Sequence, residues 1–319
     1  MPFRLQLMPQ VGDEMDTAWL LDLRALAETL NFSRAAEMRN ITQPAFGRRI
    51  KAFEEWSGSV LVDRSTHRII ITPAGEIMLD AANDILQRIE RATHDLSQER
   101  SATATLTFAA THALSFTFFP GWVQSLGSSV ATVPIRLLSD NMNECEKMMA
   151  EGRAQFLLCH FHPNSEIRLH EADFKHVELA SDILLPVAQR GKEGAPIHKL
   201  PGTPEIPVPH ISFDEKSGMG RILAANLSPV ESELHLVRVF TSHLAMVLKA
   251  LALEGKGVAW IPRSLASSEL EPEGKLAVAG DERWMVPVKI VLIRSRTRMT
   301  ELAEKFWMTV ESASKRTPV

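Results

Sequence analysis

The feature that most constrains this chain is the stretch 31–75, NFSRAAEMRNITQPAFGRRIKAFEEWSGSVLVDRSTHRIIITPAG. It predicts two short helices joined by a tight connection and followed by a two-stranded β-ribbon. Ser33 is predicted to cap the first helix and Asn40 to close it. Thr42 is predicted to cap the second helix. Pro44 is tolerated in its first turn, because the missing N–H would have no helical partner there.

The second helix has two different faces. Phe46, Ile50 and Phe53 recur at spacings of four and three, so this stripe is expected to face a core. The outward face carries Gln43, Pro44, Gly47, Arg48 and Lys51. An amide or a guanidinium can make paired hydrogen bonds to base edges in the major groove. The two helices therefore predict a helix-turn-helix whose second helix reads DNA.

The order of motifs in this stretch resembles the winged helix-turn-helix of LysR-type transcriptional regulators. The resemblance rests on Ala35-Ala36, Gln43-Pro44-Ala45, Arg48-Arg49, Phe53-Glu54, Leu61 to Arg64 and Thr72 to Gly75. The chain departs from the family at Gly47, where a DNA-contacting Ser is usual, and at Val62, where Phe is usual. The predicted DNA-contacting residues are Ser33, Arg34, Thr42, Gln43, Pro44, Gly47, Arg48, Lys51, Arg64 and Arg68.

The flanking segments complete a predicted DNA-binding domain over 16–75, after an N-terminal extension at 1–15. A helix over Thr17–Leu30 is expected to brace the helix-turn-helix. The runs Val60–Val62 and Ile69–Ile71 are expected to form the wing, where an Arg touches phosphate more often than base. The net charge is −4, so the positive charge needed for phosphate contacts must be local. Such weak overall charge indicates that one module binds poorly alone and that a dimer is needed.

A heptad pattern follows the wing, in a predicted linker helix over 76–100. The apolar seam is Met78, Ala82, Ile85, Ile89, Ala92 and Leu96. Such a helix either lies on its own domain or pairs two subunits. Its place after a winged helix favours pairing. We therefore expect a homodimer, or a dimer of dimers, presenting two recognition helices to the half-sites of a double-stranded promoter operator.

From about Ala102 strands alternate with helices, which predicts a parallel sheet. The order of elements over 101–319 resembles the effector-binding domain of the same family. The resemblance implies two α/β subdomains of periplasmic-binding-protein type, with subdomain I at about 103–180 and 285–312 and subdomain II at about 181–284. The predicted fold class is thus α+β and multidomain: a winged helix-turn-helix, a linker helix, and then these two subdomains.

In such folds ligands bind at the carboxyl ends of strands and against helix N-termini. Polar residues stand at four predicted ends of this kind, and each group could instead be an ordinary helix cap. The effector candidates taken from them are Thr111, His112, Ser115, Ser139, Ser217, Met219 and Thr241.

Met219 stands out because glycines flank it in a predicted loop-to-helix turn. An accessible thioether is readily oxidised to a polar sulfoxide. The segments SFDEKSGMGRIL, GKGVAWIP and RTRMTELAEKFW resemble those of the hypochlorite-responsive subgroup of the family, which implies a role in the oxidative stress response. Leu126 and Leu244 stand where that subgroup has further methionines. An oxidant or an ordinary small-molecule effector therefore both remain as the expected partner.

Other classes of protein have weaker support. No run is long and apolar enough to suggest a membrane span, no export signal is recognisable, and two cysteines fit a reducing cytoplasm. Cys159-His160-Phe161-His162 lacks a third ligand at zinc spacing, and no nucleotide or nucleophile motif occurs, so we expect no metal, cofactor or enzymatic activity. A cytoplasmic small-molecule-binding protein is the alternative from another class, and the fused helix-turn-helix argues against it.

Overall fold

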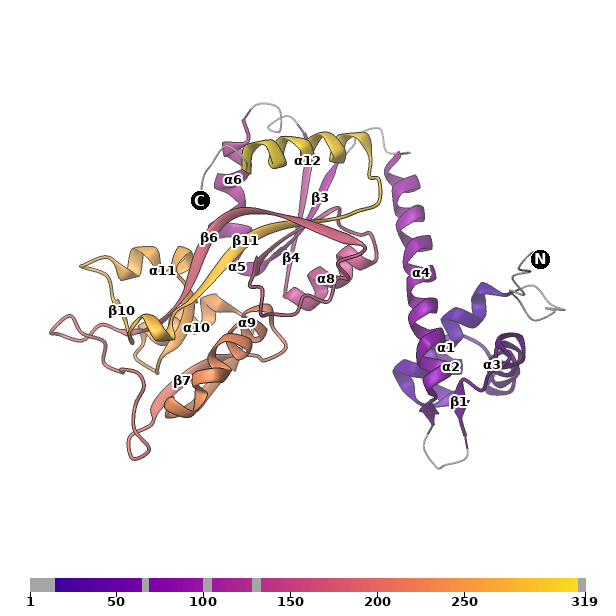
Figure 1. Ribbon diagram of the computed structural model, residues 1–319, viewed down its shortest axis with the longest axis horizontal. Helices are drawn as coiled ribbons and strands as arrows, with labels where there is room; N and C mark the ends of the chain where they lie inside the picture. Colours follow the sequence, from indigo (N-terminus) through magenta and orange to yellow (C-terminus); the bar gives the residue numbers. More distant parts are fainter. Residues whose placement is uncertain (1–14, 65–68, 100–104, 128–132, 315–319) are drawn as a thin grey trace, which may run out of the picture. The chain divides into compact units, whose positions relative to one another are not determined.

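The computed structural model describes residues 15–64, 69–99, 105–127 and 133–314. The chain divides into two compact units, Met1–Thr93 and His94–Val319. Figure 1 labels the helices and strands of both units. Among the described residues, no helix is long and apolar enough to cross a membrane.

The first unit is a three-helix core with a small wing and a long following helix. Its elements are α1 (Thr17–Thr29), α2 (Phe32–Met38), α3 (Gln43–Ser57), β1 (Val62–Asp63), β2 (Ile70–Ile71) and α4 (Pro73–Glu99). The predicted stripe of Phe46, Ile50 and Phe53 is fully buried. The strands β1 and β2 pair antiparallel, as expected for the wing. Helix α1 ends at Thr29, one residue before the predicted end. Leu30 is its C-cap, in a left-handed conformation, and is 51% exposed.

The caps of the two short helices differ from the sequence prediction. The Asn31 side chain caps α2, accepting hydrogen bonds from the backbone N–H groups of Ser33 (2.9 Å) and Arg34 (3.1 Å). The predicted Ser33 cap is therefore wrong, because the helix begins two residues earlier than a Ser33 cap would allow. Thr42 does occupy the N-cap position of α3, but its side chain makes no capping hydrogen bond.

Helix α4 carries two apolar stripes rather than one. Ala82 is fully buried and Met78 packs against the same core, so these two predicted seam residues belong to their own domain. Leu86 lies in that core as well. Ala82 thus has no surface to offer a second subunit, and its assignment to a dimer seam is corrected. Among the described side chains of α4, the large apolar residues Ile77, Ile85, Ile89 and Leu96 are exposed, as is Ala92.

The second unit is built on one mixed sheet rather than a parallel one. The strand order is β10-β6-β11-β5-β3-β4, with β9 also paired to β6. Within the described part of this sheet, β3 pairs parallel with β4 and β5, whereas β11 runs antiparallel to both β5 and β6. The strands of this sheet are β3 (Leu106–Thr111), β4 (Ile135–Asp140), β5 (Phe156–Phe161), β6 (Phe174–Gln189), β9 (Ala259–Pro262), β10 (Leu276–Val278) and β11 (Val286–Ser295).

A separate parallel pair, β7 (Val208–Phe213) and β8 (Leu236–Ser242), lies outside that sheet. The connecting elements are α5 (His112–Thr117), α6 (Phe119–Ser125), α8 (Met142–Ala150), α9 (Gly218–Leu227), η1 (Ser228–Glu233), α10 (Ala245–Leu253), α11 (Arg263–Leu270), η2 (Glu282–Trp284) and α12 (Glu301–Ser314). Helix α5 was not anticipated, because its six residues show no apolar period.

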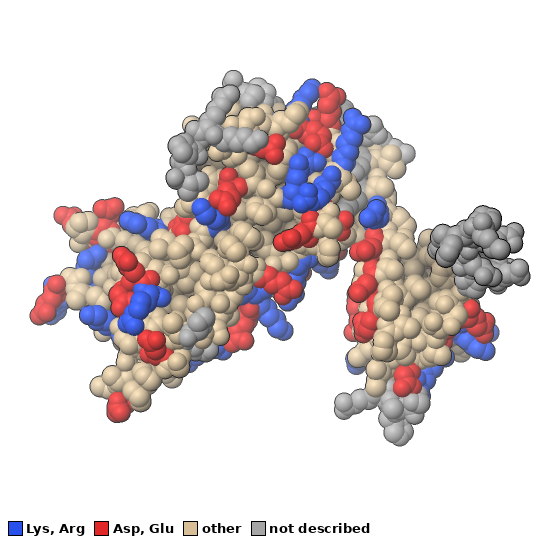
Figure 2. All heavy atoms as spheres, viewed as in Figure 1, with Lys and Arg blue, Asp and Glu red and all other residues tan. Residues whose placement is uncertain are grey.

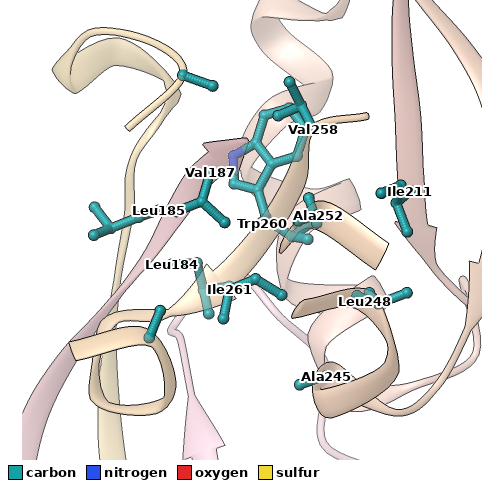
Figure 3. Packing of buried hydrophobic residues seen from close by; sticks show 14 of the residues in the cluster. Leu184, Leu185, Val187, Ile211, Ala245, Leu248, Ala252, Val258, Trp260 and Ile261 are labelled. Carbon is teal, nitrogen blue, oxygen red and sulfur yellow. The ribbon is translucent and has the colours of Figure 1, made fainter. Parts of the chain in front are cut away.

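One hydrophobic cluster on this sheet contains Ala109, Cys159 and Val291, and two further hydrophobic regions lie along the sheet. One contains Phe108, Phe156, Phe306 and Trp307. The other surrounds Trp260, which packs with residues of β6 and α10 (Figure 3). The long strands β6 and β11 contribute to both regions and run side by side in Figure 1. The predicted subdomain boundary at 180/181 falls inside β6, so a continuous strand rather than a loop carries the chain across it.

Candidate nucleic-acid interface and regulatory pocket

The outward face of α3 is open in the isolated unit. Gln43, Pro44, Arg48 and Lys51 are exposed, and Gly47 is half-buried. A Cβ atom at Gly47 would meet nothing within 4 Å. Close approach to another part of this protein is therefore not the reason for a glycine here. Arg34 on α2 is also exposed.

Several basic side chains of this unit are paired with acidic side chains of the same unit. Arg39 and Arg49 point to the buried Asp22 carboxylate at 2.7 Å and 2.9 Å. Lys51 is 3.5 Å from Glu55 on the helix surface. Among the described residues, no ion pair is found for Arg34 or Arg48. Blue and red atoms are intermixed over the face seen in Figure 2, as the small net charge implies.

Glu54 organises the base of the wing. Its Oε1 accepts hydrogen bonds from the backbone N–H groups of Leu61 (3.0 Å) and Val62 (3.1 Å). Its Oε2 accepts one from Arg64 at 2.9 Å, and the Arg64 guanidinium also lies 5.0 Å from the centre of the Phe32 ring. Arg64 is thus held close to α2 and α3. Arg68, the other predicted wing contact, lies outside the described residues.

In the second unit, residues from several of the predicted strand ends line a small pocket. Its volume is about 50 Å³, and the predicted residues Thr111, His112, Ser217 and Met219 line it. The N-caps of α8 and α9, Asn141 and Ser217, both face it. Because backbone N–H groups at helix N-termini attract negative charge, this pocket suits a small anionic or strongly polar species.

Three of the predicted effector residues do not line this pocket. Ser139 Oγ is within hydrogen-bonding distance of His112 Nδ1 (3.1 Å) and of Ser115 Oγ (3.0 Å), so Ser139 contacts a residue of the pocket wall without lining the pocket itself. Thr241 lies on β8, where its hydroxyl is 3.0 Å from Ser212 Oγ. The pocket residues not chosen from sequence are Ala113, Asp140, Asn141, Met142, His160, Phe213, Gly218, His243 and Ala245.

Two polar atoms in the pocket wall have no hydrogen-bond partner within the described residues. They are Thr111 Oγ1 and His160 Nδ1, both buried. His160 Nε2 lies 3.4 Å from Asp182 Oδ2, which also accepts a hydrogen bond from Ser264 Oγ at 2.6 Å. Burial acts to raise the pKa of Asp182, but the hydrogen bonds from His160, Ser264 and the Ile183 N–H outweigh it and lower this pKa. Buried polar atoms without partners are uncommon, and either an ordered water or a bound species would supply the hydrogen bonds that these two atoms lack.

The two thiols of this unit are buried, whereas its thioethers range from the buried Met142 to the exposed Met246 and Met308. Cys145 and Cys159 are fully buried, and burial raises the pKa of Cys145 to about 12 and that of Cys159 further. Both are therefore protonated and unreactive near neutral pH. Met219 is half-buried and lies in the pocket wall. No group of three or more potential metal ligands occurs in the described part of the chain.

Both units of the chain match known protein families. Residues 18–76 match the bacterial regulatory helix-turn-helix of the lysR family, and residues 99–314 match the LysR substrate binding domain. HTH-type transcriptional regulator YjiE of Escherichia coli (strain K12) is 31% identical over 299 residues, covering 92% of this chain and 93% of that protein. This chain belongs to the LysR family of bacterial transcriptional regulators.

Solved structures of full-length relatives share the fold. HypT from Salmonella typhimurium, described as a hypochlorite-specific LysR-type transcriptional regulator, is 27% identical with a TM-score of 0.58, covering 95% of this chain and 100% of that chain. DarR from Vibrio fischeri, solved in complex with DNA, is 28% identical with a TM-score of 0.54, covering 93% of this chain and 99% of that chain. The chain is thus a DNA-binding transcriptional regulator with a substrate-binding effector domain, and its matched relatives are regulators.

Proposed function

We propose that this regulator alters its binding to promoter DNA when a small oxidant converts Met219 to its sulfoxide. The observation that carries the proposal is the placement of the Met219 thioether in the wall of a pocket of about 50 Å³ at the N-termini of α8 and α9. Ligand pockets for metabolites usually measure about 300–1,000 Å³. The space at Met219 fits a species of a few atoms, whereas a separate pocket of this unit, lined in part by His210, Arg238 and Trp260, measures about 650 Å³.

The chemistry requires only an oxygen transfer. Hypochlorite gives its oxygen atom to the Met219 sulfur and leaves as chloride, so the thioether is oxidised by two electrons and the hypochlorite is reduced. The product is a polar sulfoxide in place of an apolar group. Met219 packs against the core around Trp260, so a polar oxygen there disturbs packing on the side of α9. The similarity to HypT, whose description names hypochlorite, supports the same class of oxidant.

On the DNA side, we infer that Gln43 and Arg48 read bases while Arg34, Lys51 and Arg64 contact phosphates. The first pair lies exposed on α3, where an amide and a guanidinium have the required donors. Ser33, Thr42, Pro44 and Gly47 border this face. The exposed stripe of α4 (Ile85, Ile89, Ala92 and Leu96) is inferred to join two subunits.

The test is DNA-binding anisotropy on a duplex selected from a random library, before and after stoichiometric hypochlorite. Met219→Leu removes the sulfur at nearly constant volume, and such swaps usually cost less than about 1.5 kcal/mol. We expect oxidant to change wild-type affinity and to leave Met219→Leu unchanged. Met308→Leu is the matched control, because Met308 is 56% exposed on α12 and does not line the pocket. Equal responses of wild type and Met219→Leu would reject Met219 as the sensor.

A second candidate is a small-molecule effector with no redox role. Thr111 Oγ1 and His160 Nδ1 favour it, because a bound ligand would supply the hydrogen bonds that these buried atoms lack. Under this alternative Met219→Leu responds like wild type, whereas Thr111→Val abolishes the response to the effector. A metabolite screen read out by the same anisotropy would separate the two candidates.

A further inference from the structure

One buried carboxylate joins the three helices of the DNA-binding unit. Asp22 lies in the middle of α1 and is 0% exposed. Its Oδ1 accepts a hydrogen bond from Arg39 Nε at 2.7 Å. Its Oδ2 forms an ion pair with Arg49, 2.9 Å from Nε, but without the geometry of a hydrogen bond. Arg39 is the C-cap residue of α2, and Arg49 is in α3. The neighbours of Asp22 on the same face of α1 are the buried Ala25 and Leu26.

Burial of the Asp22 carboxylate is energetically unfavourable unless its charge is paired. A buried carboxylate must be paired, because leaving it unpaired costs several kcal/mol. Here one carboxylate holds two guanidinium groups, so the cluster keeps a net positive charge. The Arg39 and Arg49 side chains are 25% and 29% exposed, so each still reaches the surface of the unit. Arg49 follows Arg48 directly in α3, one residue from the proposed base-reading face.

These two arginines would otherwise be available to DNA. Phosphate neutralisation by free Arg and Lys supplies most of the non-specific affinity of a DNA-binding protein, whereas base contacts supply the specificity. A recognition helix must also sit at a defined angle for a few side chains to reach base edges. Holding Arg39 and Arg49 inward serves both requirements at once.

We propose that Asp22 is a positioning residue for DNA recognition. It fixes α3 against α1 and α2, and it withholds Arg39 and Arg49 from the DNA backbone. The consequence is a higher ratio of specific to non-specific affinity.

The experiment uses the full chain and measures anisotropy on a selected duplex and on a scrambled duplex between 50 and 200 mM salt. For Asp22→Asn we expect specific affinity to fall by about tenfold, because α3 loses its anchor. Non-specific affinity is expected to rise. The slope of log affinity against log salt should steepen by about 0.9 for each arginine that turns to a phosphate.

The matched control is the triple variant Asp22→Asn, Arg39→Gln, Arg49→Gln. Its salt slope should return to the wild-type value while specific affinity stays low, because the freed arginines are gone but the anchor is still missing. Thermal unfolding of each variant checks that the unit remains folded. If Asp22→Asn does not fold, Arg49→Lys replaces it, since lysine keeps the charge but cannot reproduce the Nε contact. Arg49→Lys should lower the specificity ratio.

Two results would overturn the proposal. Specific and non-specific affinities that fall together at an unchanged salt slope would make Asp22 a purely structural residue. If a folded Asp22→Asn variant keeps the wild-type ratio of specific to non-specific affinity and the wild-type salt slope, Asp22 has no role in DNA recognition.

Discussion

The two units of this regulator assemble their functional residues in opposite ways. The proposed DNA-contacting groups of the first unit come from one continuous stretch, on α2, α3 and the wing. The pocket of the second unit is built from chain segments near residues 111, 140, 160, 217 and 243. A local pattern can therefore predict an interface on one helix, whereas a pocket depends on which strands become neighbours.

If this separation holds, changes in one unit should leave the other function intact. The largest effect is expected from the α4 stripe, where Ile85 is 39% and Ile89 47% exposed. Ile85→Glu combined with Ile89→Glu should give monomers in sedimentation, because two carboxylates replace an apolar contact. Affinity for a two-half-site operator should fall by about 10²–10⁴ as avidity is lost. Met308→Glu on α12 is the control for an added surface charge. If the double variant remains dimeric, the contact between subunits does not lie on this stripe of α4.

The next effect is expected in the second unit and should spare DNA binding. Arg294, 3% exposed at its side chain, donates two hydrogen bonds to Glu304, at 2.7 Å and 2.8 Å. These bonds lower the pKa of Glu304 from 4.5 to about 2. Glu304→Gln should reduce the free energy of unfolding by roughly 1.5–3 kcal/mol at pH 7, measured by urea denaturation.

The pH dependence of that variant has a defined sign. Because the folded-state pKa of Glu304 is depressed, its contribution is present above about pH 4.5 and is lost as pH falls toward about 2. The stability difference between wild type and Glu304→Gln should therefore shrink between these pH values. A difference that stays constant over this range would show that the carboxylate charge is not what stabilises the fold.

A smaller effect is expected at the recognition helix. Arg48→Ala should weaken binding to the selected operator by about 1–3 kcal/mol, because a guanidinium contact to a base edge is lost. Its effect on random duplex should be smaller. Lys51→Ala is the comparison, since a phosphate contact should weaken binding to both duplexes alike. Equal losses for Arg48→Ala on both duplexes would reassign Arg48 to the phosphate backbone.

The smallest effect is expected at Gly47. A Cβ there meets nothing within 4 Å, so Gly47→Ala should raise the free energy of unfolding by about 0.5–1 kcal/mol. If the glycine serves close approach of α3 to the groove, operator affinity should fall while stability rises. Unchanged affinity would show that the groove has room for a methyl group at this position.

Sequence reasoning succeeded where side-chain period and burial agree. Phe46, Ile50 and Phe53 were predicted to be buried from their spacing, and they are. It failed at Ala82, because one long helix carries two apolar stripes and the heptad spacing alone does not say which faces the domain. It also failed at Ser33, because Asn31 and Ser33 are both good caps and tertiary packing sets where α2 begins.

For the pocket, Thr111, His112, Ser217 and Met219 could be chosen as residues at strand ends and helix starts. His160 was not chosen, although it is the next-to-last residue of β5, because the pairing of β5 with β3 is what brings its ring to the pocket. Asp182 was not predicted from the sequence either, since it lies within the long strand β6.

The family, the order of the two functional units and the exposed face of α3 follow from the sequence alone, because these depend on residue types a few positions apart. Only the tertiary structure decided that Arg39 and Arg49 turn inward to Asp22 and that Met219 shares a pocket with His160. The physical reason is that charge pairing and cavity formation depend on contacts between residues distant in the chain, and residue spacing carries no information about those distances.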